Sequence, residues 1–403
     1  MRVLVCAVEA PLPPINGFRL MLTALVRELR REHRVRVLAL RAPDQDSDAA
    51  DEDLRLVARP PSRFGGAALA SAIVRQRPLR ADAVAASFAT PLREELASFR
   101  PDVVHVTSGR LAGLGRGLAR APAVLGALDA WHVNVEARAL VADGVRGRLL
   151  RAEAGRVRRF EAAEYGRFAR VVVVSPQDRE ALLSVNPKLS ISVIPNGVDT
   201  TFFAPDSEAR RNSSGIAFTG VMSYAPNVLA AEFLAREVFP LVQERHPAAR
   251  LALVGRAPTD RVRALHDLEG VEVTGEVPDL RPWLLRSGAY TCPMLSGTGI
   301  KNKLLEAMAC ACACVVTPLA LQGLHVEDGR EVIVGTSAKE LACGVLRVLE
   351  DPVCRDELGH AARRYVLSEH DWGAAARAYA SVYEDVLANR GELRSAPSGG
   401  EST

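Results

Sequence analysis

Lysine and aromatic residues are both scarce in this 403-residue sequence. Only Lys188, Lys301, Lys303 and Lys339 are lysines among 51 basic residues, a bias typical of a GC-rich genome. The formal net charge of +3 is small for this length, so bulk charge gives no sign of a nucleic-acid partner, and we expect none. Nearly half of the residues are hydrophobic and a quarter are charged, which is typical of globular proteins.

The sequence also lacks a disulfide framework and a long hydrophobic run. Its seven cysteines are an odd number without the spacing of a secreted scaffold, which favours a reducing compartment. The apolar run Val3 to Val8 is too short for a signal peptide, and the longest uncharged run, 307–326, is interrupted by Pro318, Gln322 and His325. We therefore expect a cytoplasmic protein and leave peripheral contact with the inner membrane face open.

Short valine-rich runs alternate with helical patterns through the first half of the chain. Residues 2–8 read as a buried parallel strand, and an amphipathic helix is expected at 19–32. Further strands are expected at 35–40, 103–106, 124–128 and 171–174, and the acidic segment 41–53 is expected to be a solvated loop. This rhythm predicts an α/β domain with a parallel sheet.

The same rhythm restarts after the segment IPNGVD at 194–199. Strands are expected at 215–219, 251–254, 271–273, 290–293 and 314–317, with a helix at 227–244. We therefore predict two Rossmann-like domains, residues 1–190 and 191–371, with a C-terminal helix at 372–390 that packs back on the first domain. The composition of residues 391–403 predicts a disordered tail.

The segment SGTGIKNKLLE at 296–306 is the most informative stretch. Gly297 and Gly299 allow a backbone to approach a ligand closely, and a helix that starts near Ile300 points its free N–H groups at the same place. Lys301 and Lys303 add cations where the helix dipole disfavours them, which indicates an anionic ligand.

Helical spacing refines this anion-site prediction. Gly299, Lys303 and Glu306 follow at intervals of four and three and should share one face, while Lys301 should point elsewhere. A diphosphate with a ribose fits such an arrangement, with Glu306 accepting hydrogen bonds from sugar hydroxyls. The alternative is that Lys303 and Glu306 form only a solvated surface pair and that the glycines serve a turn.

Several segments together resemble the retaining glycosyltransferase family 4. They are VVSPQDREAL at 173–182, IPNGVD at 194–199, FTGVMSYAPN at 218–227, LVGRAP at 253–258, TGEVPDLRPWL at 274–284 and GTGIKNKLLEAMA at 297–309. They occur in the family's order over residues 1–385, which makes the set far more specific than any single segment.

This resemblance implies the GT-B fold, in which two Rossmann-like domains face each other across a cleft. It also implies a retaining, hexosyl-type transferase that uses a nucleotide-diphosphate sugar, a hydroxyl-bearing acceptor and no obligatory metal or other cofactor. The loop at 274–279 is where the family binds the base. The residues that match donor-binding positions of the family are Gly17, Gly220, Thr298, Gly299, Ile300, Lys301, Lys303 and Glu306.

The sequence departs from the family's pattern at the sugar end of this site. Glu306 matches the second glutamate of the family's E-x7-E motif, but Thr298 stands where the first is usual. No cation follows the strand at 215–219, so Lys301 and Lys303 are left to carry the leaving-group charge.

The resemblance also points to the segment LDAWHVN in the first domain, where the family often has a histidine that faces the donor sugar. Asp129 stands nearest that position and His132 follows, so either is a candidate to orient a hydroxyl of the donor or acceptor, and with Lys303 they form the predicted catalytic set. The alternatives are a helix N-cap for Asp129 and an ordinary surface histidine for His132.

Two further features have simpler readings. The cysteines at 310, 312 and 314 fall where the family has small residues, so we expect buried packing rather than metal binding. The helix expected at 146–170 carries eight arginines, which indicates a solvated face or a docking patch for an anionic acceptor or an acidic membrane.

Three functions remain open from the sequence. The favoured one is sugar transfer in polysaccharide or glycolipid assembly or in tailoring of a secondary metabolite. The alternatives are a nucleotide-sugar epimerase and a non-catalytic partner that has kept the fold.

Overall fold

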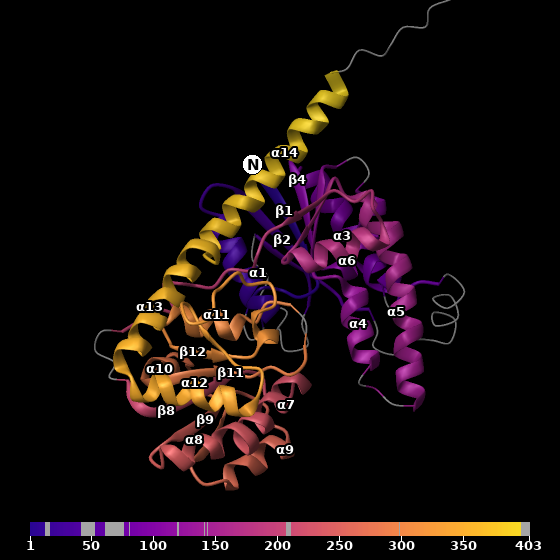
Figure 1. Cartoon of the computed structure of the whole chain (residues 1–403). Helices are drawn as coiled ribbons and strands as arrows, with labels where there is room; N and C mark the ends of the chain where they lie inside the picture. The colour runs from indigo at the N-terminus through magenta and orange to yellow at the C-terminus, as the bar shows by residue number, and fades with distance from the viewer. Residues whose placement is uncertain are drawn as a thin grey trace, which may run out of the picture. The chain divides into compact units, whose positions relative to one another are not determined.

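The computed structural model describes residues 1–12, 17–41, 53–60, 76–79, 81–118, 121–140, 142, 144–206, 211–297 and 299–395. The chain divides into two compact units. In Figure 1 the indigo-to-magenta segments and the yellow helix α14 form one unit, and the segments of intermediate colour form the other. Unit 1 comprises Met1–Pro195 and Gly373–Thr403, and unit 2 comprises Asn196–Trp372.

Unit 1 is built on a seven-stranded parallel sheet with the strand order β3-β2-β1-β4-β5-β6-β7. Five of its strands, β1, β2, β4, β5 and β6, lie where the sequence predicts them. The elements are β1 (Arg2–Ala7), α1 (Gly17–Leu29), β2 (Arg34–Leu40), β3 (Leu54–Val57), α3 (Ala81–Ser98), β4 (Val103–Thr107), η2 (Gly109–Gly117), β5 (Ala123–Leu128), α4 (Trp131–Leu140), α5 (Gly144–Glu164), η3 (Tyr165–Arg167), β6 (Arg170–Val173), α6 (Pro176–Val185), β7 (Ile191–Val193) and α14 (Trp372–Ser395).

Unit 2 has a six-stranded parallel sheet with the order β10-β9-β8-β11-β12-β13. Its elements are β8 (Asn212–Thr219), α7 (Ala225–Phe233), a π-helical turn η4 (Leu234–Val238), α8 (Phe239–Arg245), β9 (Arg250–Val254), α9 (Asp260–Arg263), η5 (Ala264–Asp267), β10 (Val271–Gly275), α10 (Arg281–Arg286), β11 (Ser287–Cys292), α11 (Asn302–Ala309), β12 (Cys314–Val316), η6 (Pro318–Leu321), β13 (Ile333–Val334), α12 (Ala338–Glu350) and α13 (Pro352–Glu369).

The central strands of both sheets are buried over most of their length, as the near-continuous apolar runs predict. In β1 every residue from Val3 to Ala7 is fully buried, and β11 is buried along its whole length. Both sheets also have the doubly wound order, in which the chain leaves two neighbouring strands toward opposite faces. This switch lies between β1 and β4 in unit 1 and between β8 and β11 in unit 2.

Helix α14 packs on the sheet of unit 1 through aromatic side chains. The hydroxyl of Tyr383 lies 2.7 Å from Nδ1 of His105 in β4, and both residues are buried. Burial lowers the pKa of His105 to about 3, so the imidazole is neutral. Helix α14 continues to Ser395, which corrects the prediction of a disordered tail from residue 391, while residues 396–403 lie outside the described part.

The sequence patterns missed the shortest strands. β3, β7 and β13 have four, three and two residues. β6 and β12 are as short as β3 and β7 but were predicted, because they are continuous valine-rich apolar runs, whereas β3 and β7 contain polar residues. Most of the predicted acidic loop, residues 42–52, lies outside the described residues.

Candidate functional site

The carboxyl edge of the unit 2 sheet ends in glycines on three adjacent strands. Gly220 follows β8, Gly255 follows β9, and Gly275 ends β10. The N–H of Gly220 donates to the carbonyl of Val254 at 3.0 Å, and that of Gly255 to the carbonyl of Gly275 at 3.2 Å. In doubly wound sheets ligands bind outside this edge at the switch point. Here the three strands on one side of the switch point end in residues without side chains.

Gly255 is required by the closeness of two backbones. A Cβ on Gly255 would lie 1.7 Å from the carbonyl oxygen of Gly220, and its φ of +152° is unfavourable for an L side chain. We expect Gly255→Ala to lower the free energy of unfolding by about 3 kcal/mol and to abolish nucleotide binding, because Gly220 must move.

Urea unfolding and calorimetric titration with a nucleoside diphosphate test this expectation. Gly329→Ala is the matched control, since Gly329 also has a positive φ, +79°, but open space around its Cβ position. Equal effects of the two substitutions would contradict the steric argument.

The loop after β11 leads into α11, whose first residue is Asn302 rather than Ile300 as predicted. Gly299 has a φ of +72° and is not helical, so the prediction that Gly299 shares a helix face with Lys303 and Glu306 is wrong. Ile300 packs against the core of unit 2. Thr298 lies outside the described residues.

Lys303 lies directly beside the glycine edge. Its ammonium donates to Oδ1 of Asn227, lies 4.8 Å from the centre of the Phe218 ring, and would lie 3.3 Å from a Cβ on Gly220. Asn227 is buried and is itself fixed by a 2.9 Å hydrogen bond to the carbonyl of Val221. The loop after β8, which has no cation of its own, thus positions a cation from α11.

The sequence suggested that Lys301 points away from Lys303. In the structure the two ammonium groups lie close enough to interact electrostatically. The side chain of Lys301 is buried, and its ammonium donates to the carbonyl of Gly299. Burial, helped by the nearby charge of Lys303, lowers the pKa of Lys301 to about 8. Burial also lowers the pKa of Lys303. Among the described residues, neither ammonium has a carboxylate within ion-pair distance. A bound anion would supply the negative charge that these two lysines lack.

The carboxyl group of Glu306 is one helical turn beyond Lys303 and is half-buried. Burial raises its pKa to about 7, and the charge of Lys303 opposes the shift. No hydrogen bond to this carboxylate occurs within the described ranges. A solvated surface pair does not have these properties, so that alternative fails for Lys303 and Glu306.

The lowered pKa of Lys301 predicts how anion affinity depends on pH. A diphosphate binds the ammonium form, which the free protein loses as the pH rises through about 8. Affinity for a nucleoside diphosphate should then fall by up to about tenfold per pH unit above that value. Titration calorimetry in buffers of different ionisation enthalpy should detect proton uptake there.

Lys301→Arg is the control for this pH dependence, because a guanidinium stays charged. Its affinity should fall less steeply than that of the wild type as the pH rises through about 8, the remaining fall coming from Lys303, whose pKa burial also lowers. An equally shallow fall in the wild type would contradict the assignment of the pKa.

In unit 1, the predicted residues lie at two places on the sheet edge. Gly17 is exposed and is the first residue of α1, which follows β1. Asp129 follows β5, whose last residue, Leu128, has a strained φ of +71°. Burial, helped by the nearby charge of Asp178, raises the pKa of Asp129 to about 6.

The N-cap alternative for Asp129 does not describe its contacts. Asp129 lies two residues before the first residue of α4, and its carboxylate is hydrogen-bonded to the side chain of Asn134. The N–H of Ala130 donates instead to Asp178 at 2.9 Å.

His132 is buried, which overturns its reading as a surface histidine. Its Nδ1 lies 2.5 Å from Oε2 of Glu161, and Glu161 is completely buried on α5. The hydroxyl of Tyr165 donates to the other carboxylate oxygen at 3.5 Å. A carboxylate on Nδ1 fixes the orientation and tautomer of an imidazole, and leaves Nε2 to act on a ligand.

Neither Glu161 nor Asn227 stands out in the sequence as part of these sites. Glu161 stands in an arginine-rich helix, 29 residues from its partner, and reads there as a neutralising surface charge. Asn227 belongs to the segment FTGVMSYAPN, but its role depends on a lysine 76 positions later.

The clustered cysteines pack in the core, as predicted. Cys310, Cys312 and Cys314 are all buried in unit 2, and burial raises the pKa of each thiol. Among the residues that the structure describes, no group of three or more histidine, cysteine or acidic side chains could hold a metal ion.

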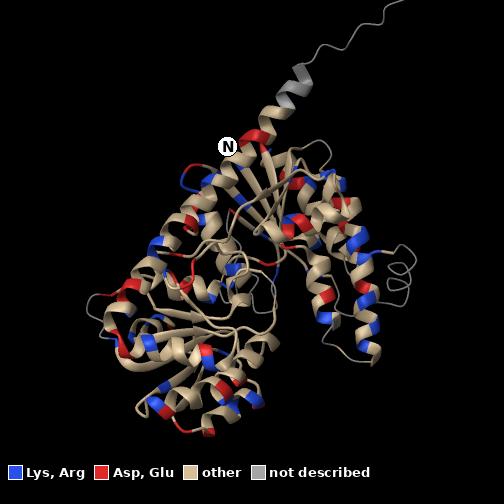
Figure 2. Ribbon diagram, viewed as in Figure 1, with Lys and Arg blue, Asp and Glu red and all other residues tan. Residues whose placement is uncertain are grey.

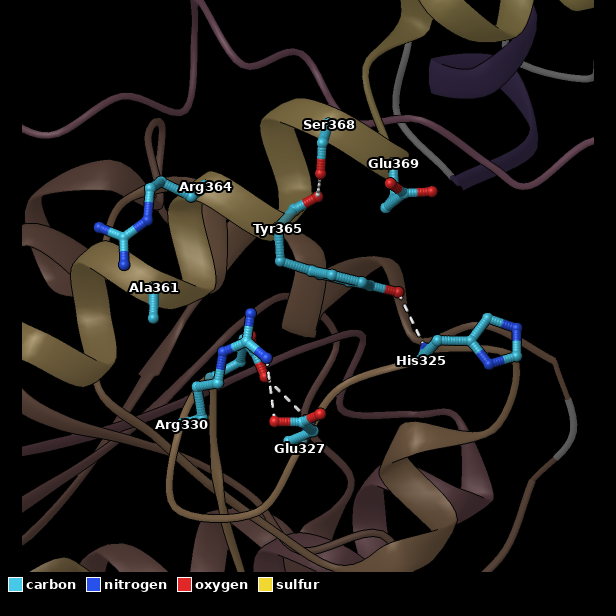
Figure 3. A pocket seen from close by; sticks show the side chains of 9 residues that line it. His325, Glu327, Arg330, Ala361, Arg364, Tyr365, Ser368 and Glu369 are labelled. Atoms are coloured by element: carbon cyan, nitrogen blue, oxygen red, sulfur yellow. Dashed lines mark hydrogen bonds and ion pairs between the residues drawn. The ribbon is translucent and has the colours of Figure 1, made fainter.

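Unit 2 also has a polar hollow of about 550 Å³ between α13 and the loop after η6 (Figure 3). Of its charged groups, Arg330 binds Glu327 at 2.9 Å and Glu331 at 3.0 Å. The hydroxyl of Tyr365 accepts from the N–H of His325 at 2.9 Å.

Among its described residues, the chain has no helix long and apolar enough to span a bilayer.

Two family models match the chain in succession. Residues 15–202 match the model Glycosyltransferase Family 4, and residues 213–351 match Glycosyl transferases group 1. The first match falls almost entirely in unit 1 and the second in unit 2.

The curated relatives share less than 30% of their aligned residues with this chain. The α-maltose-1-phosphate synthase of Mycobacterium tuberculosis is 29% identical over 249 residues, covering 54% of this chain and 63% of that protein. A GDP-mannose-dependent α-(1-6)-phosphatidylinositol monomannoside mannosyltransferase of Mycolicibacterium smegmatis is 27% identical over 248 residues, covering 56% of this chain and 64% of the other. The chain thus spans less than two thirds of the length of these relatives.

Solved structures resemble the fold over nearly the whole chain. Sucrose-phosphate synthase from Thermosynechococcus elongatus has a TM-score of 0.73 at 17% identity and covers 96% of this chain and 99% of its own. Anabaena HepE, solved with UDP and glucose, has a TM-score of 0.65 at 15% identity and covers 95% and 99%.

Proposed function

Because this chain belongs to glycosyltransferase family 4, with two parallel α/β units of the GT-B fold class, we propose that it transfers a sugar from a nucleotide-diphosphate donor to an acceptor hydroxyl. The observation that carries the proposal is the pair of ammonium groups of Lys301, which is buried, and Lys303, which is half-buried, at the switch point of unit 2. Neither has a carboxylate within ion-pair distance among the described residues, and burial lowers the pKa of both. A diphosphate supplies the missing charge.

The two lysines and the N–H groups at the start of α11 stabilise the departing diphosphate. Such preorganised electrostatic contacts are commonly the largest contribution to catalysis. Glu306 accepts hydrogen bonds from the ribose, and the glycine edge admits the nucleotide backbone closely.

The proposed reaction proceeds with retention of configuration. The bond between the anomeric carbon and the phosphate oxygen breaks, and the acceptor oxygen bonds to the same carbon from the same face. The acceptor's proton passes to the leaving phosphate oxygen. No separate protein base is needed for this step, and no metal is part of it.

We place this activity in the cytoplasm, with peripheral contact at the inner membrane face. All seven cysteines are free thiols, which fits a reducing compartment.

A screen for donor binding tests the proposal. Thermal shifts with UDP, GDP, ADP and TDP, each alone and as sugars, should single out one nucleotide, since a ligand at 100 times its Kd stabilises by about 2.7 kcal/mol. Proton NMR of the products then gives the anomeric configuration.

The outcomes separate the alternatives. Transfer or hydrolysis with a retained anomer supports the proposal, and an inverted product contradicts it. Interconversion of donor isomers without an acceptor identifies an epimerase. Tight donor binding with no turnover identifies a non-catalytic partner.

A further inference from the structure

The first half of α5 exposes aliphatic side chains among arginines. Val145 and Leu149 are 65% and 66% exposed, the exposure expected of polar residues. With Arg148 and Ala152 they follow the spacing i, i+3, i+4, i+7, so the four share one side of the helix. We call these four residues, together with Arg146 and Arg151 that flank them, the outer face of α5.

The inner side of α5 is packed, which fixes how the outer face is presented. Ala154 and Val157 form a small buried cluster with Val135 of α4. Gly147 is buried, and a Cβ there would lie 2.2 Å from the carbonyl oxygen of Ala142. Figure 1 shows α4 and α5 side by side, extending away from the unit 1 sheet.

The charge on the outer face is of one sign. Residues 144–152 contain three arginines and no acidic residue, and the blue of α5 in Figure 2 marks the arginines along this helix. Among the described residues, Arg146, Arg148 and Arg151 have no ion-pair partner. Glu153, the next acid along α5, is already bound to Arg156 at 3.1 Å and to the N–H of Leu79 at 2.9 Å.

We infer that the outer face of α5 docks the protein on an anionic lipid surface. Arginines alone would also fit a nucleic acid or an acidic polysaccharide, but neither partner in water gains from exposed valine and leucine side chains. The interface of a bilayer accepts both, because aliphatic groups enter the acyl boundary while guanidinium groups remain at the head-group phosphates. Because only a few apolar side chains enter the bilayer, the contact between the outer face of α5 and the membrane is reversible.

Vesicle sedimentation tests this inference with the whole protein. The wild type should bind vesicles of phosphatidylcholine with phosphatidylglycerol, bind phosphatidylcholine alone far more weakly, and lose binding as salt is added. R146Q/R148Q/R151Q should weaken binding roughly 100-fold, about fivefold per arginine. V145S/L149S should weaken it by about tenfold or more.

Matched variants on unit 2 serve as controls. R236Q/R245Q/R347Q removes the same charge from exposed arginines, and V353S/L367S removes comparable exposed aliphatics, 67% and 45% exposed. Both should bind like the wild type. The single variants R148E and L149S carry the test if a multiple variant fails to fold.

Three results would overturn the inference. The first is that the wild type does not bind anionic vesicles, and the second is that the unit 2 controls lose as much vesicle binding as the α5 variants. The third is that the protein binds no vesicles but self-associates, and that the α5 variants abolish this self-association, which identifies a second copy as the partner. The inference does not depend on donor chemistry, since no donor is present in the assay. Vesicle binding by a protein that transfers no sugar would leave it standing and would overturn only the proposed function.

Discussion

Lys303→Met is expected to lower kcat for donor turnover by about 10²- to 10³-fold, the usual cost of removing one preorganised group that stabilises developing negative charge. Methionine keeps the length of the side chain and its contact with the Phe218 ring and Met294, so the packing of unit 2 changes little. The loss should appear in kcat because the charge on the diphosphate develops as the glycosidic bond breaks.

Lys339→Met is the matched control for this prediction. It removes the same charge from an exposed lysine at the start of α12 and should turn over donor like the wild type. Steady-state rates of nucleotide release, with thermal melts of both variants, decide between the outcomes. Wild-type rates in Lys303→Met would refute the donor-site assignment.

Glu306→Ala completes the same test from the nucleoside side. Losing a hydrogen-bonding carboxylate should raise the Kd of the nucleoside diphosphate about 10- to 100-fold. The effect belongs to binding rather than to the chemical step, so Lys303→Met and Glu306→Ala should differ in which constant they change.

The sequence predicted the framework of both units correctly, because parallel strands buried on both faces leave valine-rich runs that are hard to mistake. It also singled out Lys303, since a cation at the start of a helix conflicts with the dipole, and Glu306 one turn later. Their role in binding a donor stays a prediction. The strand count was incomplete because β3 and β7 interrupt their short apolar runs with polar residues and β13 has only two residues.

The contacts that complete each site could not be read from the sequence. A helix start moved by two residues was enough to take Gly299 off the face of α11 and to bring Lys301 close to Lys303. Glu161 pairs with His132 only because α5 packs against α4, and local charge patterns contain no information on that packing. Sequence periodicity shows which side of a helix or strand is buried. Which side chains contact each other depends on how the helices and strands pack together.

The pair of His132 and Glu161 gives the second prediction with a large expected effect. His132→Ala should lower sugar transfer by about 10²-fold, the cost of losing the orientation of a reacting group. It should also lower the free energy of unfolding by roughly 3 kcal/mol, because Glu161 is then a buried carboxylate without its partner. Activity and stability thus fall together in this variant, and a second substitution must separate them.

His132→Ala/Glu161→Leu separates the two effects. Removing the carboxylate as well takes away the unpaired buried charge, so urea unfolding should recover most of the lost stability. Transfer should remain about 10²-fold low, because no imidazole is present to orient the hydroxyl. Recovery of activity together with stability would make His132 a structural residue only.

His105→Ala provides the reference for a buried histidine of unit 1 with no role in the site. Its imidazole bonds to Tyr383 rather than to a carboxylate, and burial keeps it neutral, with a pKa lowered to about 3. This variant should lose stability but transfer sugar at the wild-type rate at temperatures where it stays folded. A difference between the two histidine variants in rate, with a similar loss of stability, is the result that assigns His132 to the reaction, since burial alone is common to both.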